Sequence, residues 1–151
     1  MAKRYAVRRS IEAPANRVWR LLTAADQYTR WNPTVLSLEG RIAAGEKIKL
    51  VSTANPKRAF ALTVSDVAPG ASMVWSSGMP LGLFSGRRTF TLEPASSGGT
   101  EFAMEEIYRG ALAPLITRSI PDLTDTFAQF ADGLKAEAEA IGQRDIGQRD
   151  Q

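Results

Sequence analysis

The chain contains no cysteine and no histidine among its 151 residues. The first absence excludes disulfide bonds, a thiol nucleophile and any metal site built on cysteine. The second excludes Ser-His-Asp and Cys-His mechanisms and removes the commonest general base. The acidic residues Asp122, Asp125 and Glu137 show no ligand-like clustering. We therefore expect no bound metal and no cofactor.

Long hydrophobic runs are missing too, since none approaches the roughly 20 residues that cross a bilayer. The start, Met1 to Arg9, is polar and basic rather than an apolar signal segment. The expected location is therefore the cytoplasm, without stable membrane insertion. The formal net charge is +3, with Lys3, Arg4 and Arg8 near the start. No nucleic-acid motif accompanies these residues, so we expect a solvated first strand and no nucleic-acid partner.

Length and composition fit one globular domain. The 151 residues are 44% hydrophobic and 23% charged. A chain of this length and composition can bury a hydrophobic core without covalent cross-links. The last ten residues, GQRDIGQRDQ, are polar and repeat the tetrapeptide GQRD. They predict a disordered tail over 142–151 and a domain over 1–141. Monomer and homodimer both stay open.

Apolar periodicity predicts the order of elements. Residues 5–11 alternate as a strand, and Pro14 suits the first turn of a helix. Two short helices follow, and Asn32-Pro33 stops the second. Period-two alternation with turn signals about every ten residues then predicts an antiparallel meander.

The last segment is helical by its spacing. An apolar stripe runs from Ile116 to Leu134 in steps of three and four residues. Pro121 lacks the N–H that an unbroken helix would use, which predicts a kink or break there. The stripe needs an apolar partner, and the concave side of the sheet is the expected one.

Residues 88–108 predict a β-hairpin with alternation on both arms, RTFTLEP and TEFAMEEIY. If Leu92 pairs with Phe102, the antiparallel register places Arg88 opposite Glu106 on the same face as the apolar residues. An ion pair on that face indicates a concave, partly polar interior. A slip of one residue would reverse every face and leave both charges in solvent.

This order of elements resembles the helix-grip fold of the START/Bet v 1-like superfamily, also called the polyketide cyclase/dehydrase and lipid-transport group. The resemblance covers residues 5–141 and is carried by IEAPANRVWRLLTAADQYTRWNPTV (11–35), MVWSS (73–77), GGTEFAMEEIYRG (98–110) and FAQFADGLKAEAE (127–139). It implies an α+β fold with a curved antiparallel sheet of about seven strands. The sheet would wrap around a long C-terminal helix, with two short helices after the first strand.

The resemblance also implies an apolar cavity between the sheet and the long helix. Its expected walls are the inner face of 116–134 and the side chains of Phe60, Leu62, Trp75, Phe90, Phe102, Met104 and Phe127. Arg88, Glu106 and Tyr108 would orient the polar group of a ligand. The apolar loop GMPLGLF (78–84) would lie near the cavity mouth and gate it.

Three functions remain open on this basis. The first is binding, transport or sequestration of a hydrophobic small molecule such as a lipid or polyketide, without catalysis. The second is a polyketide cyclase or aromatase-like activity in which Glu106 or Tyr108 moves protons. The third is a protein-interaction module of the co-chaperone type. Chemistry that relatives perform with a cavity histidine cannot be transferred, because the chain has none.

Overall fold

The computed structural model describes the backbone of residues 3–149 and the side chains of residues 3–142. The elements in order are β1 (Lys3–Ile11), α1 (Ala15–Thr23), the 3-10 turn η1 (Ala25–Gln27), α2 (Tyr28–Trp31), β2 (Val35–Glu39), β3 (Lys47–Ser52), β4 (Asn55–Ala68), β5 (Ser72–Met79), the 3-10 turn η2 (Pro80–Gly82), β6 (Phe84–Pro94), β7 (Thr100–Arg109), α3 (Ala113–Thr117) and α4 (Thr124–Arg149). The predicted α+β order is therefore confirmed.

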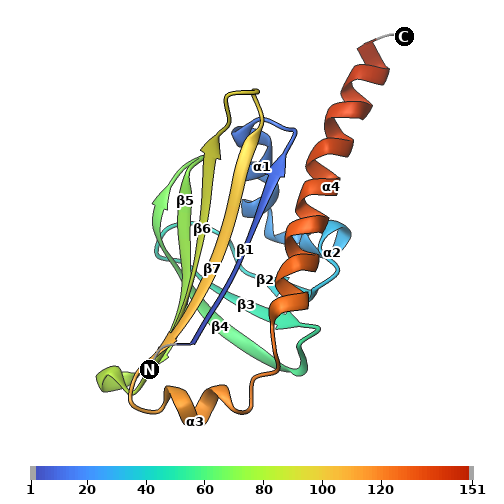
Figure 1. Ribbon diagram of the computed structural model, residues 1–151. Helices are drawn as coiled ribbons and strands as arrows, with labels where there is room; N and C mark the ends of the chain where they lie inside the picture. The colour runs from blue at the N-terminus through green and yellow to red at the C-terminus, as the bar shows by residue number, and fades with distance from the viewer. Residues whose placement is uncertain (1–2, 150–151) are drawn as a thin grey trace.

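The strands form one antiparallel sheet of seven strands in the order β1-β7-β6-β5-β4-β3-β2. From β2 to β7, each strand pairs with the next along the chain, and β1 pairs with β7. The sheet is strongly curved, with α1 at one end and η2 and α3 at the other (Figure 1). This confirms the curved sheet, the long C-terminal helix and the short helices after the first strand.

The β6–β7 hairpin has the register that the sequence predicts. Leu92 pairs with Phe102, and Arg88 pairs with Glu106. Leu92 and Phe102 are both buried. The alternation works as a guide here because one face of the hairpin is covered, so a one-residue slip would expose every apolar side chain on it.

The core is a cluster of aromatic rings between the sheet and the helices. Phe130 on α4 lies 6.1 Å from Tyr28 and 6.0 Å from Phe90, measured between ring centroids. Trp75 on β5 lies 4.7 Å from Phe90. The buried positions of α4 follow at steps of three and four from Phe127. The predicted stripe therefore packs against the concave side of the sheet.

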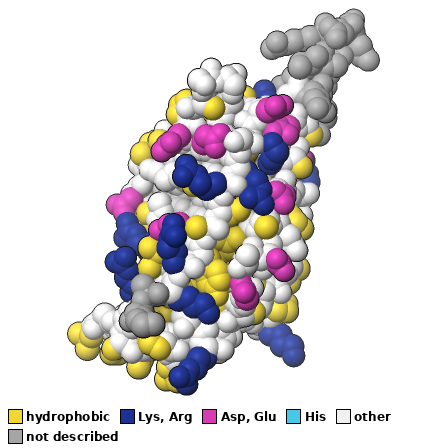
Figure 2. All heavy atoms as spheres, viewed as in Figure 1, with side chains coloured by type: hydrophobic (Ala, Val, Ile, Leu, Met, Phe, Trp, Pro, Cys, Tyr) yellow, Lys and Arg dark blue, Asp and Glu magenta, His cyan; other side chains and the backbone are white. Residues whose placement is uncertain are grey.

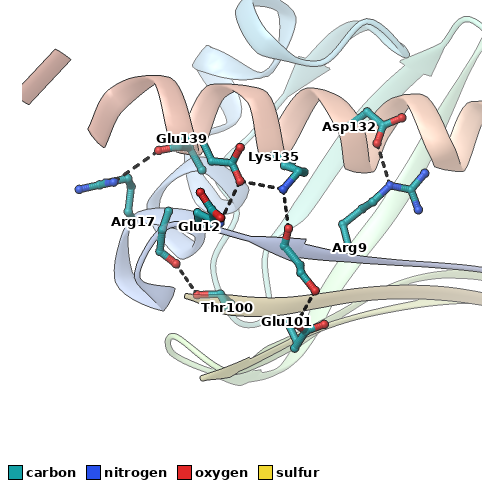
Figure 3. A network of polar contacts seen from close by, with 11 residues as sticks. Arg9, Glu12, Arg17, Thr100, Glu101, Asp132, Lys135 and Glu139 are labelled. Atoms are coloured by element: carbon teal, nitrogen blue, oxygen red, sulfur yellow. Dashed lines mark hydrogen bonds and ion pairs between the residues drawn. The ribbon is translucent and has the colours of Figure 1, made fainter. Parts of the chain in front are cut away.

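Polar contacts fasten α4 to β1 along its outer side (Figure 3). Lys135 donates a hydrogen bond of 2.6 Å to the carbonyl of Ser10 and pairs with Glu139 at 2.8 Å. The Glu139 carboxylate also accepts a hydrogen bond of 2.9 Å from the backbone N–H of Glu12. The helix is thereby held against the first strand as well as against the core.

The helical segment is interrupted where the sequence predicts a break. The helix α3 ends at Thr117, and α4 begins at Thr124, so Pro121 lies between them. The Asp122 carboxylate accepts hydrogen bonds from the backbone N–H and the hydroxyl of Thr124, which starts the new helix. The predicted tail over 142–151 stays a prediction. The backbone of α4 continues to Arg149, and residues 150 and 151 lie outside the described range.

Candidate functional site

A cavity of about 650 Å³ lies between the sheet and the segment that joins α3 to α4. Its walls come from β3, β4 and β7, from the adjoining ends of β5 and β6, and from residues 116–123. Ligand pockets in proteins have volumes of about 300–1,000 Å³. The cavity is therefore large enough for a small organic molecule.

Six of the ten predicted ligand-binding residues line this cavity, and four do not. The six are Phe60, Leu62, Trp75, Arg88, Glu106 and Tyr108. The other four are Phe90, Phe102, Met104 and Phe127, which are at most 2% exposed and belong to the closed core. The expectation that Phe90, Phe102 and Met104 line the cavity is wrong, because α4 covers that half of the sheet. Phe127 lines a smaller pocket that adjoins the cavity. Phe127 still touches the site, since it contacts Arg88.

The change from core to cavity runs along the β6–β7 hairpin. The pair Leu92–Phe102 is buried, whereas the pair Arg88–Glu106 lines the cavity. Farther along, Tyr108 pairs with Gly86, and a Cβ at Gly86 would lie 3.1 Å from the tyrosine ring. The glycine leaves room for this ring to lie across the strand.

Arg88 and Glu106 form an ion pair in the cavity wall. Nη2 of Arg88 lies 2.9 Å from Oε2 of Glu106, and the two side chains are only 15% and 13% exposed. The guanidinium also lies over the Phe127 ring, 4.9 Å from its centroid. Contacts on both sides hold the arginine in place, and the carboxylate neutralises its charge.

Tyr108 places a phenol group beside this pair. Its ring stacks on Phe84 at a centroid distance of 5.9 Å and an interplanar angle of 12°. Burial and the nearby Glu106 carboxylate raise the pKa of the Tyr108 hydroxyl well above its usual value, against the opposing charge of Arg88. The phenol is protonated at neutral pH, and a hydrogen bond between its hydroxyl and the Glu106 carboxylate is a further cause of the raised pKa.

Trp75 also lies in this wall. Its ring is 1% exposed, and its Nε1 is buried without a hydrogen-bond partner among the described residues. A smaller pocket of about 30 Å³ adjoins the cavity and is lined by Trp75, Arg88, Thr34 and Ser52. A water molecule needs about 10–15 Å³ by this measure, so the pocket has room for one polar atom or water.

Part of the cavity wall was not predicted from the sequence. Leu50, Ser52 and Arg58, from the β3–β4 hairpin, line the cavity, as does Ser77 on β5. Alternation placed Arg58 on the same face as Phe60, and its guanidinium lies 4.9 Å from that ring centroid. Strand alternation could therefore have identified Arg58 as a wall residue. It could not show at which end of the sheet the cavity opens.

The predicted mouth loop lies where it was expected. Gly78, Met79 and Phe84, from residues 78–84, line the cavity. The carbonyl of Leu83 accepts a hydrogen bond of 2.8 Å from the backbone N–H of Leu112, which ties the loop to the start of α3. A gating role for this loop stays a prediction.

Two absences concern the described residues alone. Within residues 3–149, no helix combines the length and apolar character that a bilayer crossing requires. The same part of the chain contains no group of three or more acidic residues placed to hold a metal ion.

Comparisons with solved structures support the architecture. A Mesorhizobium loti protein, MLL2253, is 22% identical, with a TM-score of 0.67 over 89% of this chain and 95% of its own. A START superfamily protein from Mycobacterium smegmatis is 14% identical, with a TM-score of 0.67 over 91% and 98%. The di-domain ARO/CYC StfQ from the steffimycin biosynthetic pathway is 13% identical, with a TM-score of 0.72 over 95% of this chain and 53% of its own. At these identities the likeness establishes the fold alone.

The sequence itself matches one family over most of its length. No functionally curated protein matches the chain. The model of the family described as "Polyketide cyclase / dehydrase and lipid transport" matches residues 3–139. These residues include every strand, the cavity and the first turns of α4. The chain therefore belongs to the polyketide cyclase/dehydrase and lipid-transport family.

Proposed function

We propose that the protein binds a hydrophobic small molecule that carries a neutral oxygen atom, such as a lipid or a polyketide. The observation that carries this proposal is the composition of the cavity wall. A neutralised ion pair and a protonated phenol lie together among apolar side chains. Such a wall combines apolar area for affinity with a few polar groups for orientation.

The charge balance favours a neutral ligand over a carboxylate. The Arg88 guanidinium is already paired with Glu106, so a bound anion would have to displace a buried carboxylate. The Tyr108 hydroxyl lies in the cavity wall, and a neutral hydroxyl or carbonyl group of a ligand would exchange hydrogen bonds with it. The apolar part of the ligand would contribute about 25 cal/mol for each Å² of apolar area removed from water.

The first test is native mass spectrometry of the freshly purified protein, followed by extraction of any bound molecule. The second is titration with Nile red, a neutral apolar dye that bears a carbonyl. Leu62→Trp would place a larger side chain in the cavity and should weaken dye binding, since it displaces apolar contacts with the dye. Thr63→Trp is the matched control, because Thr63 is the next residue on β4 and is absent from the cavity wall. Equal binding by both variants would contradict the proposal.

A second candidate is cyclisation of a poly-β-carbonyl chain held in the cavity. It is favoured by the adjacency of Glu106 and Tyr108 and by likeness to the di-domain ARO/CYC protein StfQ. Glu106 would take a proton from the carbon between two carbonyls, and Tyr108 would donate a hydrogen bond to the enolate oxygen. The enolate carbon would then attack a second carbonyl of the chain, and the resulting alkoxide would take up a proton.

This candidate predicts turnover of a poly-β-carbonyl thioester that is lost in Glu106→Gln while thermal unfolding remains cooperative. Turnover that persists in Glu106→Gln would reject the assigned base. If the unmodified protein binds Nile red but shows no turnover, the cyclase candidate is rejected and the binding function is supported.

A further inference from the structure

Large hydrophobic side chains are exposed at the cavity end of the molecule. Leu81 is 95% exposed, Met79 45% and Leu83 37%, all in or beside η2, and Leu115 on α3 is 64% exposed. Among the described side chains, only one other large hydrophobic residue, Leu36, is exposed. We call these four residues the mouth patch. Figure 2 shows hydrophobic side chains gathered at the lower end, where η2 and α3 lie in Figure 1.

The two halves of the mouth patch are held together by the backbone. Leu112 donates its N–H to the carbonyl of Leu83 at 2.8 Å, which joins η2 to α3. Gly110 permits this approach, because a Cβ there would lie 2.5 Å from the same carbonyl oxygen. The patch is therefore a preformed surface rather than two separate loops.

Leucine is an uncommon residue for the backbone conformation at position 81. Its φ of 62° lies in the left-handed region, where glycine and asparagine are the common residues. Its side chain is almost fully exposed, so packing within the protein does not explain the leucine. A contact outside the chain would explain both features.

The charged residues within the segments that carry the mouth patch are arginines. Residues 76–92 contain no acidic residue, although their two arginines, Arg87 and Arg88, are paired with Asp66 and Glu106. Residues 107–121 contain Arg109 and Arg118 and, again, no acidic residue. Arg109 and Arg118 are exposed and form no ion pair with any described residue. On the face seen in Figure 2, Lys and Arg are the charged side chains at that end.

We propose that the mouth patch docks reversibly on the surface of an anionic lipid bilayer. Apolar side chains at the tip of a surface flanked by arginines match the acyl region and the anionic head groups of such a bilayer. The patch also borders the cavity, since Met79 lines it and Ile116, next to Leu115, does too. A docked molecule would have its cavity open toward the lipid.

The test is flotation of the purified protein with two kinds of vesicle, pure phosphatidylcholine and phosphatidylcholine with about 30% phosphatidylglycerol. The protein should float with the anionic vesicles and be released by high salt, because screening weakens the arginine contacts. Leu81→Asn suits the left-handed backbone and should reduce binding by at least about tenfold, since one apolar side chain no longer enters the lipid. Arg118→Gln should reduce it about fivefold.

Matched controls separate the patch from general effects. Leu36→Asn removes an exposed leucine from β2, and Arg20→Gln removes an exposed arginine from α1 at the other end of the sheet (Figure 1). Neither control should change flotation.

Three results would overturn the inference: no flotation, equal flotation with both vesicle types, or unchanged flotation of Leu81→Asn. A dimer in analytical ultracentrifugation that Leu81→Asn dissolves would also overturn it, by assigning the patch to a second copy. Nile red titration without vesicles tests the binding function separately. Loss of flotation with intact dye binding would therefore reject the docking surface alone.

Discussion

The Arg88–Glu106 pair permits a sharp test of the site, because breaking it should cost more than deleting it. Arg88→Met leaves the Glu106 carboxylate in the cavity wall without its counter-charge, and Glu106→Leu leaves the guanidinium in the same situation. The double variant Arg88→Met/Glu106→Leu removes both charges and keeps a similar volume. The three variants with the unmodified protein form a double-mutant cycle.

The magnitude follows from the burial of the pair. Removing one partner of a fully buried pair costs about 3–5 kcal/mol. These side chains are 15% and 13% exposed and border a cavity, so about 2–3 kcal/mol is expected for each single variant. For a domain of this size that lowers Tm by about 4–12 °C. The double variant should lie within about 1 kcal/mol of the unmodified protein, since hydrophobic replacement of a buried pair is often neutral.

The assay is urea unfolding followed by tryptophan fluorescence, with circular dichroism to verify a single transition. The control pair is Arg4–Glu105 between β1 and β7, whose side chains are 62% and 36% exposed. Its coupling energy should be below about 1 kcal/mol. If the single variants of Arg88 and Glu106 add up to the double variant, the two charges are not coupled, and the buried pair is refuted as a feature of the folded protein.

Gly110→Ala should lower Tm more than the control Gly45→Ala does in thermal melts. Both glycines have positive φ, but only at Gly110 would a Cβ lie 2.5 Å from a backbone oxygen, that of Leu83. Equal shifts would contradict the close approach. Tyr108→Phe should weaken the loss of stability above about pH 10, because a folded pKa raised above the unfolded value costs stability as pH rises. Denaturant titrations near pH 9 and pH 11 test this. Hydrogen bonds from Lys135 and the backbone lower the pKa of Glu139, so its contribution is present above about pH 4.5 and is lost on acidification. Glu139→Gln should therefore flatten the acid limb of the stability curve, and an unchanged limb would contradict the assignment.

The structure could be predicted from the sequence best where one face of an element had to be covered. The hairpin register followed from Leu92 and Phe102 because the spacing of apolar residues on a half-buried strand has a strict period of two. The break at Pro121 followed from a missing N–H. Both inferences use local rules that tertiary structure does not override.

The same alternation identified a face but not a position along it. The inner face of the hairpin carries both core and cavity residues. The core residues are Phe90, Phe102 and Met104, and the cavity residues are Arg88 and Glu106. The difference is set by how far α4 covers the hairpin, which depends on where the helix starts. The start itself follows from Pro121 and Asp122, but the place where the helix crosses the sheet is a tertiary feature, so the division of the hairpin between core and cavity could not be predicted from strand periodicity.

The pairing of β1 with β7 has a consequence for how the protein is made. Ile11, the last residue of β1, pairs with Thr100, about 90 residues later in the chain. At the usual synthesis rate of about 5–20 residues per second, β1 waits roughly 5–20 s on the ribosome before its partner exists. During that time its backbone N–H and C=O groups form an open edge on a nascent chain. The basic residues Arg4, Arg8 and Arg9 along this strand are then a protection against premature association, because charged side chains on an edge discourage pairing with other chains.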